Sequence, residues 1–209
     1  MKLILISPSK RQDSEIGFLL NMFEQGLQTY HVRKKTFSTR ELKKYLEEIP
    51  EKYHNRIVIH THHELALKFD LKGIYISRSH KRNKFKLWFW KKWLKLRKSR
   101  LEISTTLRNV ENVLEYIPRY DYVFLAPVFD SLSGSFQAAF SEYNLAPALK
   151  NTKFKVIARG GVSTDTIQKA HSLGFWGGAF YTSVWKAANP LQEFIKVKEK
   201  FSELSLPIE

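Results

Sequence analysis

The chain has 209 residues, a net charge of +15 and no cysteine. This length suits one domain, spanning residues 1–209, with an ample hydrophobic core. The lack of cysteine excludes a disulfide scaffold, a thiolate zinc site and a cysteine nucleophile. The first apolar run, residues 3–6, is too short for a signal peptide or a membrane span, so a cytoplasmic protein is expected.

Strand and helix patterns alternate along the whole chain. Short apolar runs predict eight strands, at residues 3–6, 29–33, 56–60, 73–77, 101–105, 122–126, 156–158 and 176–182. Helical stripes separate the strands, and the second helix opens with the capping-box pair Ser38 and Glu41. Because each helix serves as a crossover, the strands run parallel, and eight such units favour a closed (β/α)8 TIM barrel. Functional residues of such a barrel lie at the carboxyl ends of its strands.

Basic side chains follow the second strand. The alternation of strand residues places His31, Arg33 and Lys35 on one side. Arginine offers a two-pronged donor to phosphate oxygens and lysine offers a point charge. This strand end is therefore predicted to hold a diphosphate or polyphosphate, with a solvated basic strand end as the alternative.

The third strand ends in a histidine-rich segment that starts with His60 and Thr61. Together with His31 and His80, these imidazoles suggest a metal site, because histidine is a common ligand of zinc and similar ions. The alternative is that the segment simply begins a helix and binds no metal.

Residues 155–183 read as strand, glycine pair, helix and strand. Gly160 and Gly161 allow the backbone to approach a ligand closely, and Thr164 or Asp165 is predicted to cap the helix that follows. The ends of strands seven and eight are a frequent phosphate site in TIM barrels, so a phosphate is predicted here. A structural unit without a ligand is the alternative.

Six motifs occur in an order that resembles the thiamine phosphate synthase/TenI family, and they cover nearly the whole chain. They are HVRKK at 31–35, GIYI at 73–76, STT at 104–106, APVFDS at 126–131, ARGGV at 158–162 and GGAFYT at 177–182. The resemblance implies a reaction that joins an aminopyrimidine diphosphate to a thiazole phosphate and releases pyrophosphate. It also implies Mg²⁺ as the cofactor.

The resemblance assigns roles to residues of this chain. It implies that Arg33 and Lys35 are catalytic and clamp the pyrophosphate. Cations at this position stabilise the negative charge that develops on the leaving group. The residues that it implies bind substrate are His31, His60, Ser104, Ser131, Gly160, Gly161, Tyr181 and Thr182.

This chain also departs from the family pattern. The two positions where the family has Mg²⁺-binding carboxylates are Thr61 and His80, and Mg²⁺ prefers carboxylate oxygens. The lysine of the loop after strand six falls near Gly134, and the TenI histidine is Pro127. Impaired catalysis is therefore expected, and a non-catalytic TenI-like protein that binds thiazole phosphate or thiamine phosphate is the alternative.

The positive charge is concentrated in residues 78–100, which hold eleven lysines and arginines and no acid and leave the rest of the chain at +4. A helix at residues 84–98 is predicted to pack Phe85, Phe89, Trp93 and Leu96 against the core, with a second apolar stripe at Leu87, Trp90 and Leu94. This surplus leaves three interpretations open: a solvated basic face, a partner contact such as a homodimer, or a helix on an anionic membrane surface. A nucleic-acid partner is not expected, because no recognition fold accompanies the charge.

Overall fold

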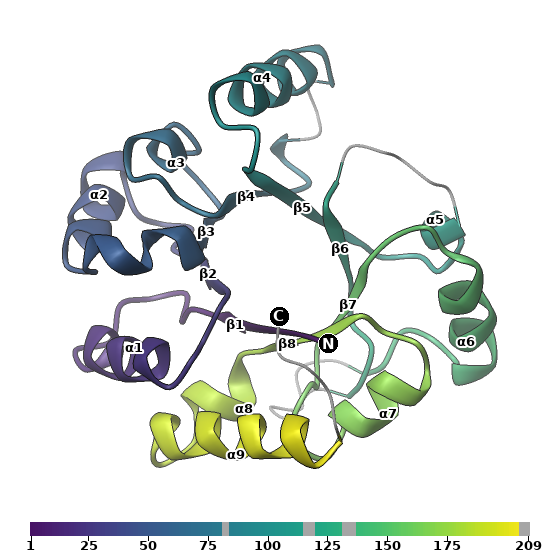
Figure 1. Cartoon of the computed structure of the whole chain (residues 1–209). Coiled ribbons are helices and arrows are strands. Elements are labelled where there is room, and N and C mark those ends of the chain that lie inside the picture. The colour runs from purple at the N-terminus through teal and green to yellow at the C-terminus, as the bar shows by residue number, and fades with distance from the viewer. Residues whose placement is uncertain (81–83, 115–119, 131–136, 205–209) are drawn as a thin grey trace.

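The computed structural model describes residues 1–80, 84–114, 120–130 and 137–204, with the backbone alone at 84–87. Eight parallel strands follow one another in chain order and close into a barrel, with β8 paired to β1. Figure 1 looks along the barrel and shows the helices arranged around the ring of strands. The predicted (β/α)8 barrel is confirmed.

The boundaries of the elements decide which residues reach the barrel mouth. The strands are β1 (Lys2–Ile6), β2 (Tyr30–Val32), β3 (Ile57–Ile59), β4 (Gly73–Ile76), β5 (Glu102–Leu107), β6 (Tyr122–Leu125), β7 (Val156–Arg159) and β8 (Gly177–Phe180). The helices are α1 (Glu15–Glu24), α2 (Thr39–Glu47), the 3-10 helix η1 (Glu51–Arg56), α3 (Leu65–Lys68), α4 (Lys84–Arg97), α5 (Glu111–Leu114), α6 (Glu142–Asn151), α7 (Ile167–Ser172), α8 (Thr182–Trp185) and α9 (Pro190–Glu203). Of the described helices, none is long and apolar enough to cross a membrane.

Local sequence signals set several of these ends. The capping box of α2 is present, with the Ser38 hydroxyl accepting from the Glu41 amide and the Glu41 carboxylate accepting from the Ser38 amide. The predicted cap of α7 is wrong, because the helix begins only after Thr166. Thr182, predicted as the end of the last strand, instead begins the short helix α8.

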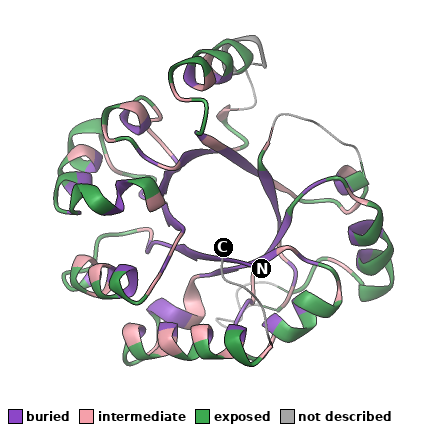
Figure 2. Cartoon of the chain, in the orientation of Figure 1, coloured by how far each residue is buried: buried purple, intermediate pink, exposed green. Residues whose placement is uncertain are grey.

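Strand alternation divides the core into two parts. Figure 2 shows the ring of strands as mostly buried, with intermediate residues in β5 and at the end of β7, whereas the helices are buried on their inner sides and exposed on their outer sides. One set of strand residues packs between barrel and helices. The other set fills the barrel itself: Ile4, Ile6, Val58, Tyr75, Tyr122, Phe124, Ile157 and Ala179.

An ion pair closes the barrel interior at the amino ends of the strands. Lys2 Nζ lies 3.0 Å from a carboxylate oxygen of Glu102, and Lys72 approaches the same carboxylate at 4.0 Å. The Lys2 ammonium also lies 4.6 Å from the centroid of the Tyr122 ring. Because these paired charges close the amino ends of the barrel, a cavity can open only at the carboxyl ends of the strands.

Helix α4 turns a different face to the barrel from the one that we predicted. Leu94 is buried and Trp90 packs against the core, whereas Phe89, Trp93 and Leu96 are 61%, 37% and 83% exposed. The predicted core face is therefore wrong at these three positions. The side chains of Phe85 and Leu87 lie outside the described residues.

The prediction failed because α4 carries two apolar stripes, and helical periodicity does not indicate which of them is buried. Lys91, on the buried side of the helix, makes a cation–π contact with Tyr120, in which its Nζ lies 3.8 Å from the ring centroid. Lys95 forms an ion pair of 3.3 Å with Asp121, the residue directly before β6. These tertiary contacts orient the helix and leave the second stripe facing outward.

Candidate active site

A cavity of about 1210 Å³ opens at the carboxyl ends of the strands. Six basic side chains line it, and among the described lining residues there is no aspartate or glutamate. The cations are Arg33 and Lys35 after β2, Arg78 after β4, Arg108 after β5, Arg159 on β7 and Lys186 after α8. Such a cavity favours a polyanionic ligand, because several cations converge without a built-in counter-charge.

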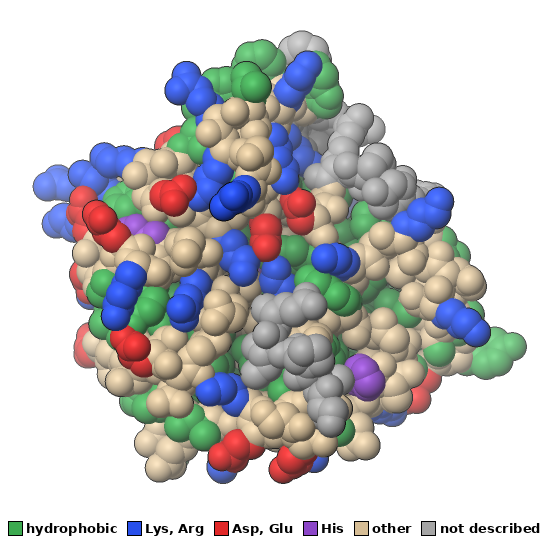
Figure 3. All heavy atoms as spheres, viewed as in Figure 1, with side chains coloured by type: hydrophobic (Ala, Val, Ile, Leu, Met, Phe, Trp, Pro, Cys, Tyr) green, Lys and Arg blue, Asp and Glu red, His purple; other side chains and the backbone are tan. Residues whose placement is uncertain are grey.

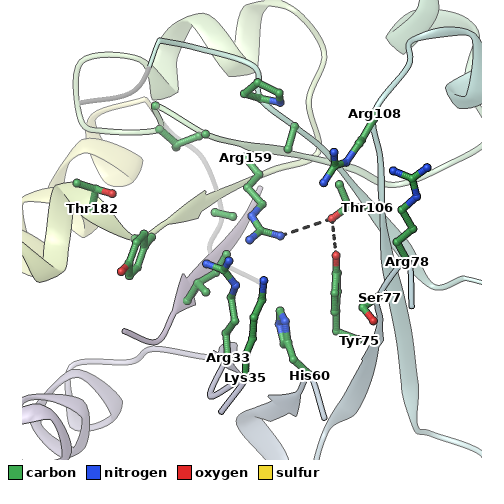
Figure 4. A pocket seen from close by; sticks show the side chains of 18 of the residues that line it. Arg33, Lys35, His60, Tyr75, Ser77, Arg78, Thr106, Arg108, Arg159 and Thr182 are labelled. Atoms are coloured by element: carbon green, nitrogen blue, oxygen red, sulfur yellow. Dashed lines mark hydrogen bonds between the residues drawn. The ribbon is translucent and has the colours of Figure 1, made fainter. Parts of the chain in front are cut away.

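Figure 4 shows how these side chains lie around the cavity. Arg33, Lys35 and Arg159 point into the same space, with Thr182 on one side and Arg78 and Arg108 on the other. The predicted catalytic pair Arg33 and Lys35 thus lies at the cavity. The carboxyl ends of strands far apart in sequence supply the remaining cations.

Lys35 is the cation whose protonation responds most directly to its neighbours. The charge of Arg33, followed by burial and by Arg159, lowers the pKa of Lys35 below its ordinary value. The largest cause of this shift is the repulsion between Lys35 and Arg33. A bound anion reverses the sign of that interaction, so the free protein favours anion binding.

A buried network fixes the end of β2. Lys34 points away from the cavity, and its Nζ lies 2.5 Å from Glu15 Oε2 with both side chains fully buried. The same ammonium donates to the carbonyls of Pro8 and Lys10, while Tyr30 and Tyr45 donate to the other Glu15 oxygen. Because Lys34 is anchored, the residues on either side of it, Arg33 and Lys35, are held toward the cavity.

Arg159 is held by a polar chain across the mouth. Its guanidinium approaches Thr106 Oγ1 at 3.5 Å, and Thr106 Oγ1 lies 2.8 Å from the Tyr75 hydroxyl (Figure 4). Burial, partly opposed by Tyr75 and reinforced by the charge of Arg33, lowers the pKa of Arg159. The guanidinium stays charged near neutral pH, because an arginine side chain loses its proton only far above neutrality.

Two histidines lie one below the other in the barrel, with their rings edge to face. His60 lines the cavity, and its Nε2 lies 3.0 Å from Nδ1 of His31, whose own Nε2 lies 2.6 Å from the Tyr122 hydroxyl. His31 is fully buried and does not line the cavity, so the prediction that it contacts substrate is not supported by its placement. Burial lowers the pKa of both imidazoles well below 6.5, and they are neutral at physiological pH. His60 also stacks on Tyr75, with ring centroids 4.1 Å apart, which fixes its orientation.

The predicted phosphate end, where β7 and β8 finish, lines the cavity with Gly160, Gly161, Tyr181 and Thr182. Gly161 has φ +65°, and a Cβ there would lie 2.2 Å from the carbonyl oxygen of Asp130. Only glycine fits this backbone. The neighbouring loops are joined where Ser183 Oγ donates to the Val162 carbonyl at 2.9 Å.

Two other predicted residues are not brought to the cavity by the described structure. Ser104 is buried lower in the barrel, where its hydroxyl donates to the Ile74 carbonyl at 3.5 Å. The inward residue at the mouth is Thr106, two positions further along the same strand. Ser131 lies outside the described residues.

Sequence reasoning missed Arg78, Arg108, Arg159 and Lys186 as cavity residues. Arg159 carries a signal that could have found it, because it follows a buried run and alternates with Ile157, which faces the barrel interior. The other three lie in loops, where strand alternation gives no direction.

The described residues do not fit the Mg²⁺ that the family pattern implies. Thr61 and His80 line the cavity but offer no carboxylate, and no described group of three His, Cys, Asp or Glu could hold a metal ion. His80 accepts hydrogen bonds from Ser77 and lies 4.6 Å from His63, centroid to centroid, rather than joining His31 and His60. Neither the carboxylate set nor the proposed histidine set is therefore assembled.

The sequence matches the family described as thiamine monophosphate synthase over residues 3–184. None of the curated proteins matches the chain. A structure of thiamine phosphate pyrophosphorylase from Bacteroides thetaiotaomicron is similar, with a TM-score of 0.77, 26% identity and coverage of 99% of this chain and 100% of that one. The thiamine phosphate pyrophosphorylase from Pyrococcus furiosus has a TM-score of 0.76 and 19% identity, covering 97% and 96%. The 3-hexulose-6-phosphate synthase from Salmonella typhimurium shares the fold, with a TM-score of 0.71, 15% identity and coverage of 97% and 99%.

Proposed function

The chain belongs to the thiamine monophosphate synthase family, and we propose that it joins an aminopyrimidine diphosphate to a thiazole phosphate, with release of pyrophosphate. The observation that carries this proposal is the cluster of cations at the mouth of a barrel that the family match spans almost completely. Both substrates are phosphorylated, and the cavity has room and charge for two phosphate-bearing groups.

The chemical step needs stabilisation of a leaving group and needs no proton transfer. The bond between the exocyclic methylene carbon of the pyrimidine and the diphosphate oxygen breaks, and the oxygen keeps the electron pair. The thiazole nitrogen donates its lone pair to the same carbon, which forms the new C–N bond. Negative charge grows on the departing pyrophosphate, so cations fixed in advance lower the barrier.

Arg33, Lys35 and Arg159 are placed to stabilise that charge. All three point into one part of the cavity, and Lys35 already has a pKa lowered by its cationic neighbours (Figure 4). As charge develops on the diphosphate, their attraction to it grows while their mutual repulsion is offset. This is stabilisation that strengthens along the reaction, as catalysis requires.

The rest of the cavity is suited to hold and orient the two substrates. Gly161 and Thr182, at the ends of β7 and β8, line the cavity, and the proposal assigns the thiazole phosphate to them. His60 presents a neutral imidazole, and because its Nε2 bonds to His31, its Nδ1 is the ring nitrogen that can meet a substrate. A neutral polar ring can hydrogen-bond an aminopyrimidine without competing with the cations for phosphate.

The test is product formation from both substrates, followed by chromatography of thiamine phosphate, with the Arg159→Met variant as the comparison. The proposal expects product with the natural chain and a large loss of rate with the variant. A folded protein that forms no thiamine phosphate above background, with or without added Mg²⁺, would refute it.

A second candidate is a non-catalytic protein that binds thiazole phosphate or thiamine phosphate. The lack of a carboxylate among the described cavity residues favours it, because the expected metal ligands are missing. Calorimetry with these two phosphates separates the candidates: binding without turnover supports this one, and turnover excludes it.

A further inference from the structure

Within the described part of the chain, the cations of the cavity are not paired with acids. Among the described residues, no ion pair joins Arg33, Lys35, Arg78, Arg108, Arg159 or Lys186 to a carboxylate, although eleven ion pairs of a lysine or arginine with an acid occur elsewhere. Elsewhere in the described structure, aspartates and glutamates pair with lysines and arginines, but here six cations line one cavity. Charges arranged in this way are available for a ligand that brings several negative charges.

Two of these cations follow β4 and β5, beside the chain position of one of the metal-binding carboxylates that the family pattern implies. Arg78 lies two residues before His80, at the end of β4, and Arg108 follows β5, which pairs directly with β4. Both side chains reach the same side of the cavity, across from Thr182 (Figure 4). The position that offers Mg²⁺ no carboxylate is therefore supplied with two guanidinium groups.

We infer that this site binds the diphosphate group without a divalent metal, and that Arg78 and Arg108 provide the positive charge that Mg²⁺ would otherwise supply. A guanidinium group donates two parallel hydrogen bonds to phosphate oxygens and keeps its charge at any physiological pH. The inference deepens the proposed function and rests on it for the identity of the diphosphate substrate.

The experiment measures binding of inorganic pyrophosphate by calorimetry, once in EDTA and once in excess Mg²⁺. A site built from guanidinium groups binds pyrophosphate at least as tightly in EDTA, because Mg²⁺ complexes the free ligand and masks its charge. A site that uses the metal binds more tightly with Mg²⁺. Tightening by about tenfold or more in Mg²⁺, or the absence of binding in both buffers, would overturn the inference.

Variants assign the effect to the two arginines. The double variant Arg78→Gln, Arg108→Gln is expected to weaken pyrophosphate binding in EDTA by at least about tenfold. This factor corresponds to the lower end of the range for the loss of one hydrogen bond to a charged group. Arg40→Gln, on the exposed side of α2, is the matched control and leaves binding unchanged. Thermal melts confirm that each variant is folded, and unchanged affinity in the folded double variant would refute the assignment.

Turnover measurements separate this inference from the proposed function. Thiamine phosphate formed in EDTA supports both. Product that forms only with Mg²⁺ keeps the proposed function and overturns the inference. Pyrophosphate binding in EDTA without product under any condition removes the synthase activity but leaves the metal-free binding of diphosphate standing.

A different observation supports a second inference, on the outward face of α4. Phe89, Trp93 and Leu96 recur at the spacing of one helical face, and Trp88, 44% exposed, lies beside them. Figure 3 shows hydrophobic and basic side chains next to one another over this helix, which Figure 1 places at the rim of the molecule. The face is apolar, exposed and directed away from the barrel.

Basic side chains frame this apolar face. Lys92 Nζ lies 5.3 Å from the Trp88 ring centroid, and the Arg97 guanidinium lies 5.4 Å from that of Trp93. No acid occurs in residues 78–100. A second copy of the chain docked symmetrically here would place like charges against each other. An anionic surface satisfies both the charge and the apolar stripe.

The geometry points to α4 as a helix that lies on an anionic lipid surface. Tryptophan favours the level of the lipid headgroups, and lysine and arginine extend from an embedded helix toward lipid phosphates. At about 1.5 Å per residue, the helix lays roughly 21 Å of contact along the membrane plane.

Sedimentation with vesicles tests this assignment. The protein is expected to sediment with vesicles of phosphatidylcholine containing one-third phosphatidylglycerol and to stay in solution with phosphatidylcholine alone. Phe89→Asp with Leu96→Asp removes the binding, whereas Tyr143→Asp, an exposed residue on α6, is the matched control and keeps it.

Three outcomes would overturn it. They are equal binding to neutral vesicles, no binding to either vesicle, and a concentration-dependent dimer in ultracentrifugation that the Phe89→Asp and Leu96→Asp pair abolishes. Retained pyrophosphate binding in the double variant shows that the barrel is intact, so a loss of vesicle binding reports on the α4 face alone.

Discussion

Replacing Lys34 with methionine tests whether the buried pair with Glu15 holds the end of β2 in place. Methionine keeps the length and the apolar stem of lysine but removes the ammonium group. In the natural chain that group contacts the Glu15 carboxylate at 2.5 Å and the carbonyls of Pro8 and Lys10 at 2.8 and 3.0 Å, with both charged side chains fully buried. The variant leaves a buried carboxylate without its cation.

The expected loss of stability is about 3–5 kcal/mol, which is the range for removing one partner of a buried ion pair. The loss of the donor to two carbonyls raises the cost within this range. The Tyr30 and Tyr45 hydroxyls still donate to Glu15, and this limits the cost. For a chain of this size, the loss corresponds to a melting temperature lower by roughly 6–20 °C.

Urea unfolding and thermal melts measure the loss, and a double variant tests its cause. Adding Glu15→Gln to Lys34→Met removes the unpaired charge while keeping an oxygen for the tyrosines, so we expect recovery of about 2 kcal/mol. If Lys34→Met costs less than about 1 kcal/mol, or if the double variant is no more stable than the single one, the buried-charge explanation is wrong.

Three further predictions follow from the cavity and the barrel interior. Arg33→Ala is expected to weaken pyrophosphate binding by about 1.5–3 kcal/mol, the range for a hydrogen bond to a charged group, and calorimetry showing a smaller loss would contradict its role as a clamp. Gly161→Ala is expected to abolish phosphate binding and lower the melting temperature, because its Cβ would meet the backbone of residue 130 at a φ of +65°; a variant with natural binding would show that the loop can move. Burial lowers the pKa of His31 and His60 well below 6.5. As the pH falls below 6.5, these histidines therefore become protonated in the unfolded chain while they stay neutral in the folded protein. Stability should therefore be greatest above pH 6.5 and fall with decreasing pH, by up to about 1.4 kcal/mol per pH unit for each histidine, and equal urea midpoints at pH 7 and 5.5 would disprove this.

The sequence by itself determined the barrel and part of its mouth. Eight apolar runs separated by helical stripes specify parallel strands, because each helix must carry the chain back before the next strand begins. The glycine pair at 160–161 and the basic residues Arg33 and Lys35 were also readable, since each depends on residues adjacent in sequence. The capping box at Ser38 is local in the same sense.

The depth of each inward side chain was decided only by the tertiary structure. Alternation predicts that Ser104 and Thr106 both point into the barrel, but the pairing of β5 with β4 places Thr106 at the mouth and Ser104 below it. His31 and His60 likewise point inward, and only His60 reaches the cavity. The alternation of strand residues predicts which side chains point into the barrel. The stagger of the strands in the closed barrel decides how deep along its axis each of them lies.

The convergence of charges and the orientation of α4 also required the folded chain. Arg78, Arg108 and Arg159 lie on three different strand ends, and only closure of the barrel brings them around one cavity. On α4, the sequence offers two apolar stripes, and the contacts of Leu94 and Lys91 with the rest of the fold decide which one is buried. Local periodicity fixes which residues share a face, but the contacts made across the fold decide which face is buried and which charges meet.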